Sequence, residues 1–246
     1  MARISVLDDE ISLDEPTLVE GFPGVGLVGK IATDHMIEVH EMDHYANVHC
    51  DGLPRVAVYR EDNRSLTTPV RLYADSERDL VALRSDVPVN PSAATEVAGC
   101  LESWFSETAT FPIFLSGLGK EKGEAPPAIY GIATGDGGDA LDRAEVTEPP
   151  EAGLVSGPTG AMLAEALERD RDAVGLVVES DPQFPDPEAA RILIKDGIDP
   201  IAGTETSTDG LVDQATEIRE AKRAFAERMQ QATEESSQAE PLKMFQ

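Results

Sequence analysis

The sequence predicts an α/β fold in which helices cover a largely parallel sheet. Short apolar runs alternate with segments of helical periodicity, which is typical of strands joined by crossover helices. Two runs, Ile113–Leu115 and Val174–Val178, are apolar at consecutive positions, as expected for central strands buried on both faces. Glycine and proline stand at most junctions between the two kinds of segment.

The order of these segments gives the expected elements. Four stretches carry an apolar stripe at helical spacing: one from Val28 to Val39, one from Ala94 to Trp104, one after Gly157–Gly160 and one over Pro187–Lys195. We expect Asp136–Pro150, which is rich in glycine, acids and proline, to be an exposed loop. The predicted strands are Thr17–Phe22, Val48–Cys50, Arg55–Tyr59, Leu80–Arg84, Pro112–Leu115, Ala128–Ala133 and Val174–Glu179.

The last part of the chain differs in character. We expect residues 1–208 to form one α/β domain, 209–232 a C-terminal helix and 233–246 a flexible polar tail. Apolar residues recur along the helix at nearly heptad spacing, so it either packs on its own domain or pairs between subunits. The tail ends in apolar Met244 and Phe245 before Gln246. Such an ending is either fortuitous or a peptide that binds a partner's pocket.

Charge is the strongest feature of the composition. The chain has 246 residues with 47 acidic and 20 basic side chains, a net charge of −27, which disfavours binding to nucleic acid or anionic membranes. The acids are dispersed, which indicates a protein adapted to molar salt, where the Debye length is about 3 Å. Cys50 and Cys100 are too few for a secreted disulfide scaffold, and we expect free thiols. With no signal peptide or membrane span in the pattern, we expect a cytoplasmic, halophilic protein.

A glycine-rich turn is the most conspicuous motif. Gly24, Gly26 and Gly29 satisfy G-x-G-x-x-G between a predicted strand and helix, a pattern that binds dinucleotides by close backbone approach to the pyrophosphate. Glycine is equally required where a strand turns tightly into a helix that crosses close to a sheet. Gly29-Lys30 also approaches a P-loop, but Ile31 stands where a hydroxyl must bind Mg²⁺.

A second motif, His40-Glu41-Met42-Asp43-His44, matches the zinc-binding H-E-x-x-H pattern. The pattern works only within one helix, and here the helical stripe ends near Val39. We therefore expect ordinary surface histidines and predict no metal, no cofactor and no catalytic residues.

Taken whole, Glu20–Lys30 closely resembles the opening motif of the proteasome assembly chaperone family. Three further segments resemble family motifs in the expected order, so the resemblance extends from about Leu18 to Leu193. They are Ser116–Gly119 after a buried strand, Gly157–Ala161 at a helix start, and Pro185–Ala190.

The resemblance implies a three-layer α/β/α fold similar to the phosphorylase/hydrolase-like class, without established catalytic activity. It also implies homo-oligomers and, for archaeal members, chaperones that hold proteasome α-subunits during assembly of the core particle. Gly21, Gly24, Gly26 and Gly29 would then be structural. A small ligand could still bind at the carboxyl edge of the strands.

Some members of that family end in a hydrophobic residue, a tyrosine and any residue, and this tail inserts between α-subunits. Met244-Phe245-Gln246 is similar, with Phe in place of Tyr. Phe245 can still fill an apolar pocket, and the Gln246 carboxylate can still pair with a lysine. The sequence thus predicts a non-enzymatic chaperone or adaptor of proteasome α-subunits. The alternative is a nucleotide- or dinucleotide-binding protein that uses Gly24–Gly29.

Overall fold

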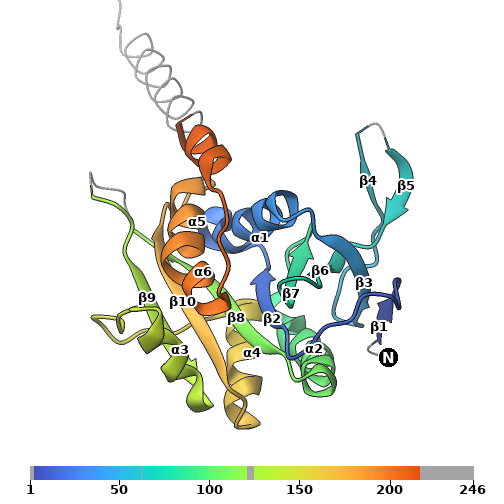
Figure 1. Cartoon of the computed structure of the whole chain (residues 1–246), viewed down its shortest axis with the longest axis horizontal. Coiled ribbons are helices and arrows are strands. Elements are labelled where there is room, and N and C mark those ends of the chain that lie inside the picture. The colour runs from blue at the N-terminus through green and yellow to red at the C-terminus, as the bar shows by residue number, and fades with distance from the viewer. Residues whose placement is uncertain (1–2, 62, 121–124, 217–246) are drawn as a thin grey trace, which may run out of the picture.

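The computed structural model describes residues 3–61, 63–120 and 125–216. Its centre is an eight-stranded mixed sheet with a separate two-stranded hairpin (Figure 1). The sheet strands are β1 (Arg3–Val6), β2 (Thr17–Gly21), β3 (Asp43–His49), β6 (Val70–Asp75), β7 (Leu80–Ser85), β8 (Phe111–Gly119), β9 (Ile129–Thr134) and β10 (Ala173–Ser180). The hairpin strands are β4 (Val58–Arg60) and β5 (Asn63–Thr67).

The strand order is β1-β3-β6-β7-β2-β8-β10-β9. The four central strands β7, β2, β8 and β10 run parallel, whereas both flanks are antiparallel. The carboxyl ends of the central strands therefore meet at one edge of the sheet, where α/β proteins place their ligands.

Helices cover both faces of this sheet (Figure 1). The α-helices are α1 (Val28–Val39), α2 (Ala94–Thr108), α3 (Gly138–Arg143), α4 (Gly157–Glu168), α5 (Pro187–Leu193) and α6 (Asp199–Ala202). Short 3₁₀ turns occupy Val25–Leu27, Pro91–Ala93 and Gly135–Gly137, a π-helical turn occupies Ile194–Ile198, and a further helix occupies 209–216. Within the described ranges, no helix is long and apolar enough to cross a lipid bilayer.

The hydrophobic core has two parts, one on each face of the sheet, because successive side chains of a strand point to opposite faces. Leu18 of β2 and Phe114 of β8 pack with α2 and α4 on one face, while their neighbours Val19 and Ile113 pack with α1 and α5 on the other. Successive side chains of a strand point to opposite faces, so a strand that is buried twice must be apolar throughout. The prediction of an α/β fold with a covered central sheet is confirmed.

Several local predictions were wrong. The expected loop over Asp136–Pro150 contains α3, because Ala140 and Leu141 are buried against the sheet and hold a helix that glycine content alone disfavours. Strands β1, β5 and β6 were not predicted, and β3 and β4 have other bounds than the predicted Val48–Cys50 and Arg55–Tyr59. In β6, Arg71 interrupts the apolar pattern. In the structure this arginine is fully buried and ion-paired with Asp86.

The prediction of free thiols was also wrong. Cys50, which directly follows β3, forms a disulfide with Cys100 of α2, 50 positions later in the chain. Both residues are buried in the core on the α2 face. Spacing along the sequence does not reveal that α2 packs against the end of β3, so the pairing followed only from the fold.

Candidate functional site

The glycine-rich turn lies at the carboxyl ends of the central strands and is filled by protein atoms. Gly26 adopts a left-handed conformation with φ of 62°, which favours glycine. A methyl group at Gly26 would lie 1.8 Å from the Ser180 hydroxyl oxygen, and one at Gly21 would lie 2.0 Å from that of Thr33. These two glycines therefore allow the turn to pack against β10 and α1.

Gly29 and Gly24 have different surroundings. A methyl group at Gly29 would lie 3.3 Å from Cβ of Leu115, so this glycine lets the start of α1 lie close to β8. A methyl group at Gly24 would meet nothing within 4 Å. Close helix packing thus accounts for Gly29, whereas nothing in the structure requires glycine at position 24.

Lys30 is directed toward carboxylates. Its ammonium group lies 2.8 Å from Asp34 and 3.7 Å from Asp86. Asp86 also pairs with the buried Arg71. Burial alone would raise the pKa of Asp86, but Arg71, Arg84 and Lys30 hold it below its ordinary value. Lys30 therefore belongs to an ion-pair network between α1 and the β6–β7 end of the sheet.

The last family-like motif closes over the glycine turn. The Asp186 backbone N–H donates to the Gly26 carbonyl at 2.8 Å. The Asp186 carboxylate caps α5 by accepting from the Ala189 N–H at 3.1 Å, and it accepts from the Asp181 N–H at 3.0 Å. The Pro185–Ala190 segment thus fixes the conformation that makes Gly26 necessary.

Glu20 joins the remaining motifs. Its fully buried carboxylate accepts hydrogen bonds from the Phe22 N–H at 2.6 Å, the Leu115 N–H at 3.2 Å and the Thr159 hydroxyl at 3.0 Å. Leu115 directly precedes the Ser116–Gly119 motif, and Thr159 lies in the first turn of α4. One buried carboxyl therefore ties three motifs to one another.

The protonation of Glu20 is unusual. Burial raises the pKa of Glu20 to about 7, although the hydrogen bonds from Phe22, Thr159 and Leu115 favour the charged form and oppose this rise. A carboxyl with such a pKa suits proton transfer in an open site. Here all three donors are protein groups in the core, so the geometry gives Glu20 a structural role. Sequence reasoning missed this role, although a lone acid at the end of an apolar strand was a visible signal.

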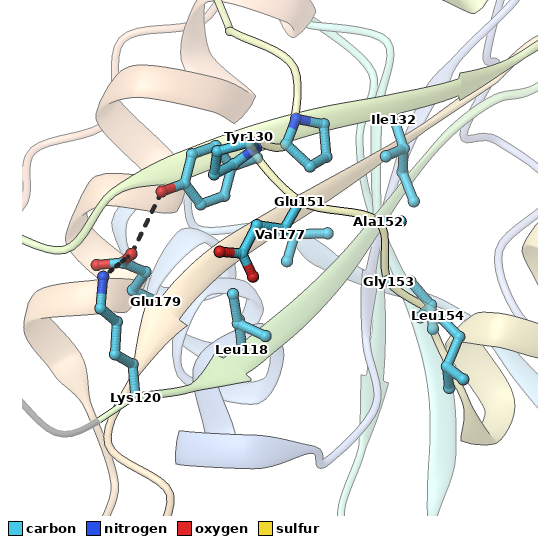
Figure 2. Close-up of a pocket in the computed structure, with 13 residues that line it drawn as sticks. Leu118, Lys120, Tyr130, Ile132, Glu151, Ala152, Gly153, Leu154, Val177 and Glu179 are labelled. Atoms are coloured by element: carbon cyan, nitrogen blue, oxygen red, sulfur yellow. Dashed lines mark hydrogen bonds and ion pairs between the residues drawn. The ribbon is translucent and has the colours of Figure 1, made fainter.

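A cavity of about 440 Å³ lies farther along the same sheet edge. Figure 2 shows its floor, which Leu118 of β8, Tyr130 and Ile132 of β9 and Val177 of β10 form. The segment 149–155 forms its wall. Most of the lining is apolar, and Leu154 on the rim is 87% exposed.

Charged groups gather at one end of this cavity. The Glu179 carboxylate accepts from the Lys120 ammonium and, at 3.3 Å, from the Tyr130 hydroxyl (Figure 2). The hydrogen bond from Lys120 holds the pKa of Glu179 below its ordinary value. Glu151 lines the same cavity, so this end carries two carboxylates and one ammonium.

The predicted tail residues Met244, Phe245 and Gln246 lie outside the described residues. The structure does describe where the C-terminal helix begins. Asp199 is buried and accepts from the Thr204 hydroxyl at 2.9 Å and from the Thr206 hydroxyl at 2.7 Å. Leu211 then packs into the core on the α1 face. The helix over 209–216 therefore starts from a fixed position on the domain.

The H-E-x-x-H residues occupy two elements. Helix α1 ends at Val39, and β3 begins at Asp43. His40 hydrogen-bonds the Thr206 hydroxyl at 2.9 Å, whereas His44 stacks on Tyr73 with ring centroids 5.2 Å apart. In the part of the chain that is described, no group of three or more His, Cys, Asp or Glu residues is arranged to hold a metal ion.

Comparison with known proteins identifies relatives over nearly the whole chain. The model of the PAC2 family matches residues 18–226. An uncharacterized protein of Methanocaldococcus jannaschii is 26% identical over 236 residues, which cover 95% of this chain and 94% of that protein.

Solved structures share the fold. PbaA of Pyrococcus furiosus, described as an archaeal homolog of proteasome-assembly chaperone, superposes with a TM-score of 0.80 at 23% identity, covering 96% of this chain and 95% of PbaA. PbaB of the same organism, described as an archaeal proteasome activator, gives 0.78 at 23% identity, covering 92% and 98% of the two chains. The mixed sheet with its covering helices is therefore a known architecture.

Proposed function

Because the chain belongs to the PAC2 family, we propose that it is a non-enzymatic chaperone or adaptor that binds α-subunits of the proteasome core particle. The observation that carries this proposal is the match of fold to PbaA and PbaB over more than nine-tenths of the chain. The proposal includes a homo-oligomer with the three-layer, phosphorylase/hydrolase-like arrangement, acting in the salt-rich cytoplasm of an archaeon. The net charge of −27 supports the salt-rich setting.

The C-terminal tail is the proposed contact with the α-subunits. Residues 209–232 form a helix in this proposal, and residues 233–246 form a flexible tail that ends in Met244, Phe245 and Gln246. The fixed start of the helix at Asp199 and Leu211 supports it, because a tail that leaves from one position on a rigid body loses less freedom when it docks. In this proposal Phe245 fills an apolar pocket of the α-subunits, and the carboxylate of Gln246 pairs with one of their lysines.

A pull-down in molar KCl against α-subunits of the same organism tests this contact. The full chain is compared with a chain that lacks Met244–Gln246 and with the single variants Phe245→Ser and Phe245→Tyr. We expect capture by the full chain and by Phe245→Tyr, and loss of capture for Phe245→Ser and the truncation. Equal capture of all four chains would refute the tail mechanism while leaving the family fold in place.

The glycine-rich turn gives less support to the alternative function, a nucleotide- or dinucleotide-binding protein. Ser180 occupies the space beside Gly26, Lys30 is paired with carboxylates, and the cavity at this sheet edge is lined by other residues. Nucleotide binding at Gly24–Gly29 therefore remains a prediction from the sequence. A rise in melting temperature with ATP or NAD(P), abolished by a bulky residue at Gly26, would support it.

A further inference from the structure

The segment that joins α6 to the helix over 209–216 is held on the domain by polar side chains. Residues 203–208, here called the strap, follow α6 and lead into that helix (Figure 1). Their side chains alternate, so that Thr204, Thr206 and Thr208 are buried while the residues between them are exposed. Each threonine buries only one methyl group, so the position of the strap depends mainly on hydrogen bonds.

The buried carboxylate of Asp199 receives the strap. It accepts from the Thr204 hydroxyl at 2.9 Å, from the Thr206 hydroxyl at 2.7 Å and from the Thr206 backbone N–H at 3.0 Å. The Thr204 backbone N–H also donates to the Asp199 carbonyl at 3.0 Å. Hydrogen bonds to a charged group are stronger than neutral ones, and a buried network that loses some of its partners becomes costly. The strap is therefore expected to attach and detach as one unit.

Two histidines also hold the strap. In α1, Nε2 of His35 lies 2.7 Å from the Ser207 carbonyl oxygen. Directly after α1, Nε2 of His40 lies 2.9 Å from the Thr206 hydroxyl oxygen. A carbonyl only accepts, and the Thr206 hydroxyl donates its single proton to Asp199, so both histidines donate from Nε2. In neutral His40 the second proton can therefore bind only at Nδ1.

That second proton is unfavourable while the strap is attached. Burial is the main cause that lowers the pKa of His40 below its ordinary 6.5, and Arg78 and His35 act in the same direction. The carboxylates of Asp75 and Asp199 oppose this shift without cancelling it. The strap contributes to the burial because it contacts the ring, so detachment exposes His40 to water. Attachment is thus strongest above pH 6.5 and weakens as pH falls below it.

Detachment of the strap also frees the helix over 209–216. The Thr208 carbonyl accepts from the N–H groups of Leu211 at 3.1 Å and Val212 at 3.3 Å, so the helix begins from the strap. Within 209–216 the buried apolar side chains are Leu211 and Ala215. A segment with so few buried apolar groups can open locally while the sheet stays folded.

We propose that the strap is a latch, closed while His40 is neutral and opened when His40 gains a second proton, which sets whether the C-terminal helix starts from a fixed position. The consequence rests on the proposed function, since a fixed start favours docking of the tail on α-subunits. The opening of the latch is measured without any α-subunit, so the two proposals can fail separately.

Hydrogen–deuterium exchange in molar KCl between pH 5.5 and pH 7.5 measures the opening. The backbone N–H groups of Thr204 and Thr206 are the reporters, since both donate to Asp199, and their rates are corrected for the intrinsic pH dependence of exchange. In the unsubstituted chain the open fraction should rise at least about twofold as pH falls through 6.5. Peptides from β8 and β10 should stay protected throughout.

His40→Gln is the decisive variant. Its amide nitrogen can donate to Thr206 as Nε2 does, but it does not titrate. At pH 7.5 its open fraction should lie within about twofold of the unsubstituted chain, and it should not rise on acidification. Thr206→Val removes a donor to Asp199 and should open at least about tenfold more at every pH. His49→Gln replaces an exposed histidine of β3 and should behave like the unsubstituted chain.

An open fraction that does not change with pH in the unsubstituted chain would overturn the latch, as would a rise that persists in His40→Gln. Parallel loss of protection in β8 and β10 would also overturn it, because the opening would then be global. Capture of α-subunits should fall between pH 7.5 and pH 5.5 for the unsubstituted chain but not for His40→Gln, and an equal fall for both would refute the role in tail docking. Absence of capture by every chain would contradict the proposed function, whereas the exchange result would still decide the latch.

Discussion

Glu20 should make the stability of the folded protein fall as pH rises from about 4.5 to 7. Burial raises the pKa of Glu20 from its ordinary 4.5 to about 7. At 1.36 kcal/mol per pKa unit, the ionised carboxyl is about 3 kcal/mol less favourable in the folded protein than in the unfolded chain. Below pH 4.5 both states bind the proton and the penalty is absent. Between pH 4.5 and 7 the folded state alone retains it, so stability falls across this window and the full penalty is present above it.

The variant Glu20→Gln isolates this contribution. Glutamine does not titrate, so the other carboxylates of the chain affect the variant and the unsubstituted protein alike. Its amide oxygen accepts from one of the two backbone N–H groups of Phe22 and Leu115, and its amide nitrogen donates toward Thr159. The other N–H loses its acceptor, which costs about 1–3 kcal/mol at every pH. This constant offset does not change with pH.

Urea denaturation in molar KCl at intervals from pH 5 to pH 8 measures the difference. Relative to the unsubstituted protein, Glu20→Gln should gain about 2.5 kcal/mol of unfolding free energy over this range, because a small part of the penalty is already present at pH 5. Glu168→Gln, an exposed carboxyl on α4, serves as control and should parallel the unsubstituted protein. Parallel curves for Glu20→Gln would refute the reasoning, since Glu20 would then stay ionised and the three donors would outweigh its burial.

Two further predictions concern the disulfide and the glycine turn. Reduction, or the double change Cys50→Ala and Cys100→Ala, opens a loop of 50 positions and should lower the unfolding free energy in urea by about 4 kcal/mol; an unchanged midpoint with and without reductant would contradict the bond. Gly26→Ala should cost at least about 1–3 kcal/mol, because φ is 62° and Ser180 fills the space. Gly24→Ala, which meets open space, should change stability by less than about 0.5 kcal/mol, and equal effects of the two would disprove the assignment of Gly26 to packing.

The sequence predicted those parts of the fold that depend on local pattern. The doubly apolar strands β8 and β10 and the stripes of α1 and α2 are visible in residue order, because the period of the pattern follows from the geometry of each element. The break of the H-E-x-x-H motif between α1 and β3 was visible for the same reason.

What the sequence did not predict depends on contacts between distant residues. The Cys50–Cys100 bond, the pairing of Arg71 with Asp86 and the donors to Glu20 each join segments that only the fold brings together. A buried arginine in β6 resembles a surface residue until its partner is known. For the same reason Lys30, which suggested a phosphate site, proved to be part of an ion-pair network.

The positions of the four family-like motifs bear on where this protein binds its partners. Glu20 joins the first motif to the strand before the second and to the helix start of the third, while Asp186 of the fourth holds Gly26 of the first. These motifs therefore act together to shape one buried junction at the carboxyl ends of β2, β8 and β10. The carboxylates of Glu20 and Asp186 are already satisfied there by protein donors, so these two groups have little left to offer a substrate. Exposed apolar side chains, among them Tyr59 and Leu66 of the β4–β5 hairpin and Leu154 beside the cavity, lie outside this junction, where another protein can reach them.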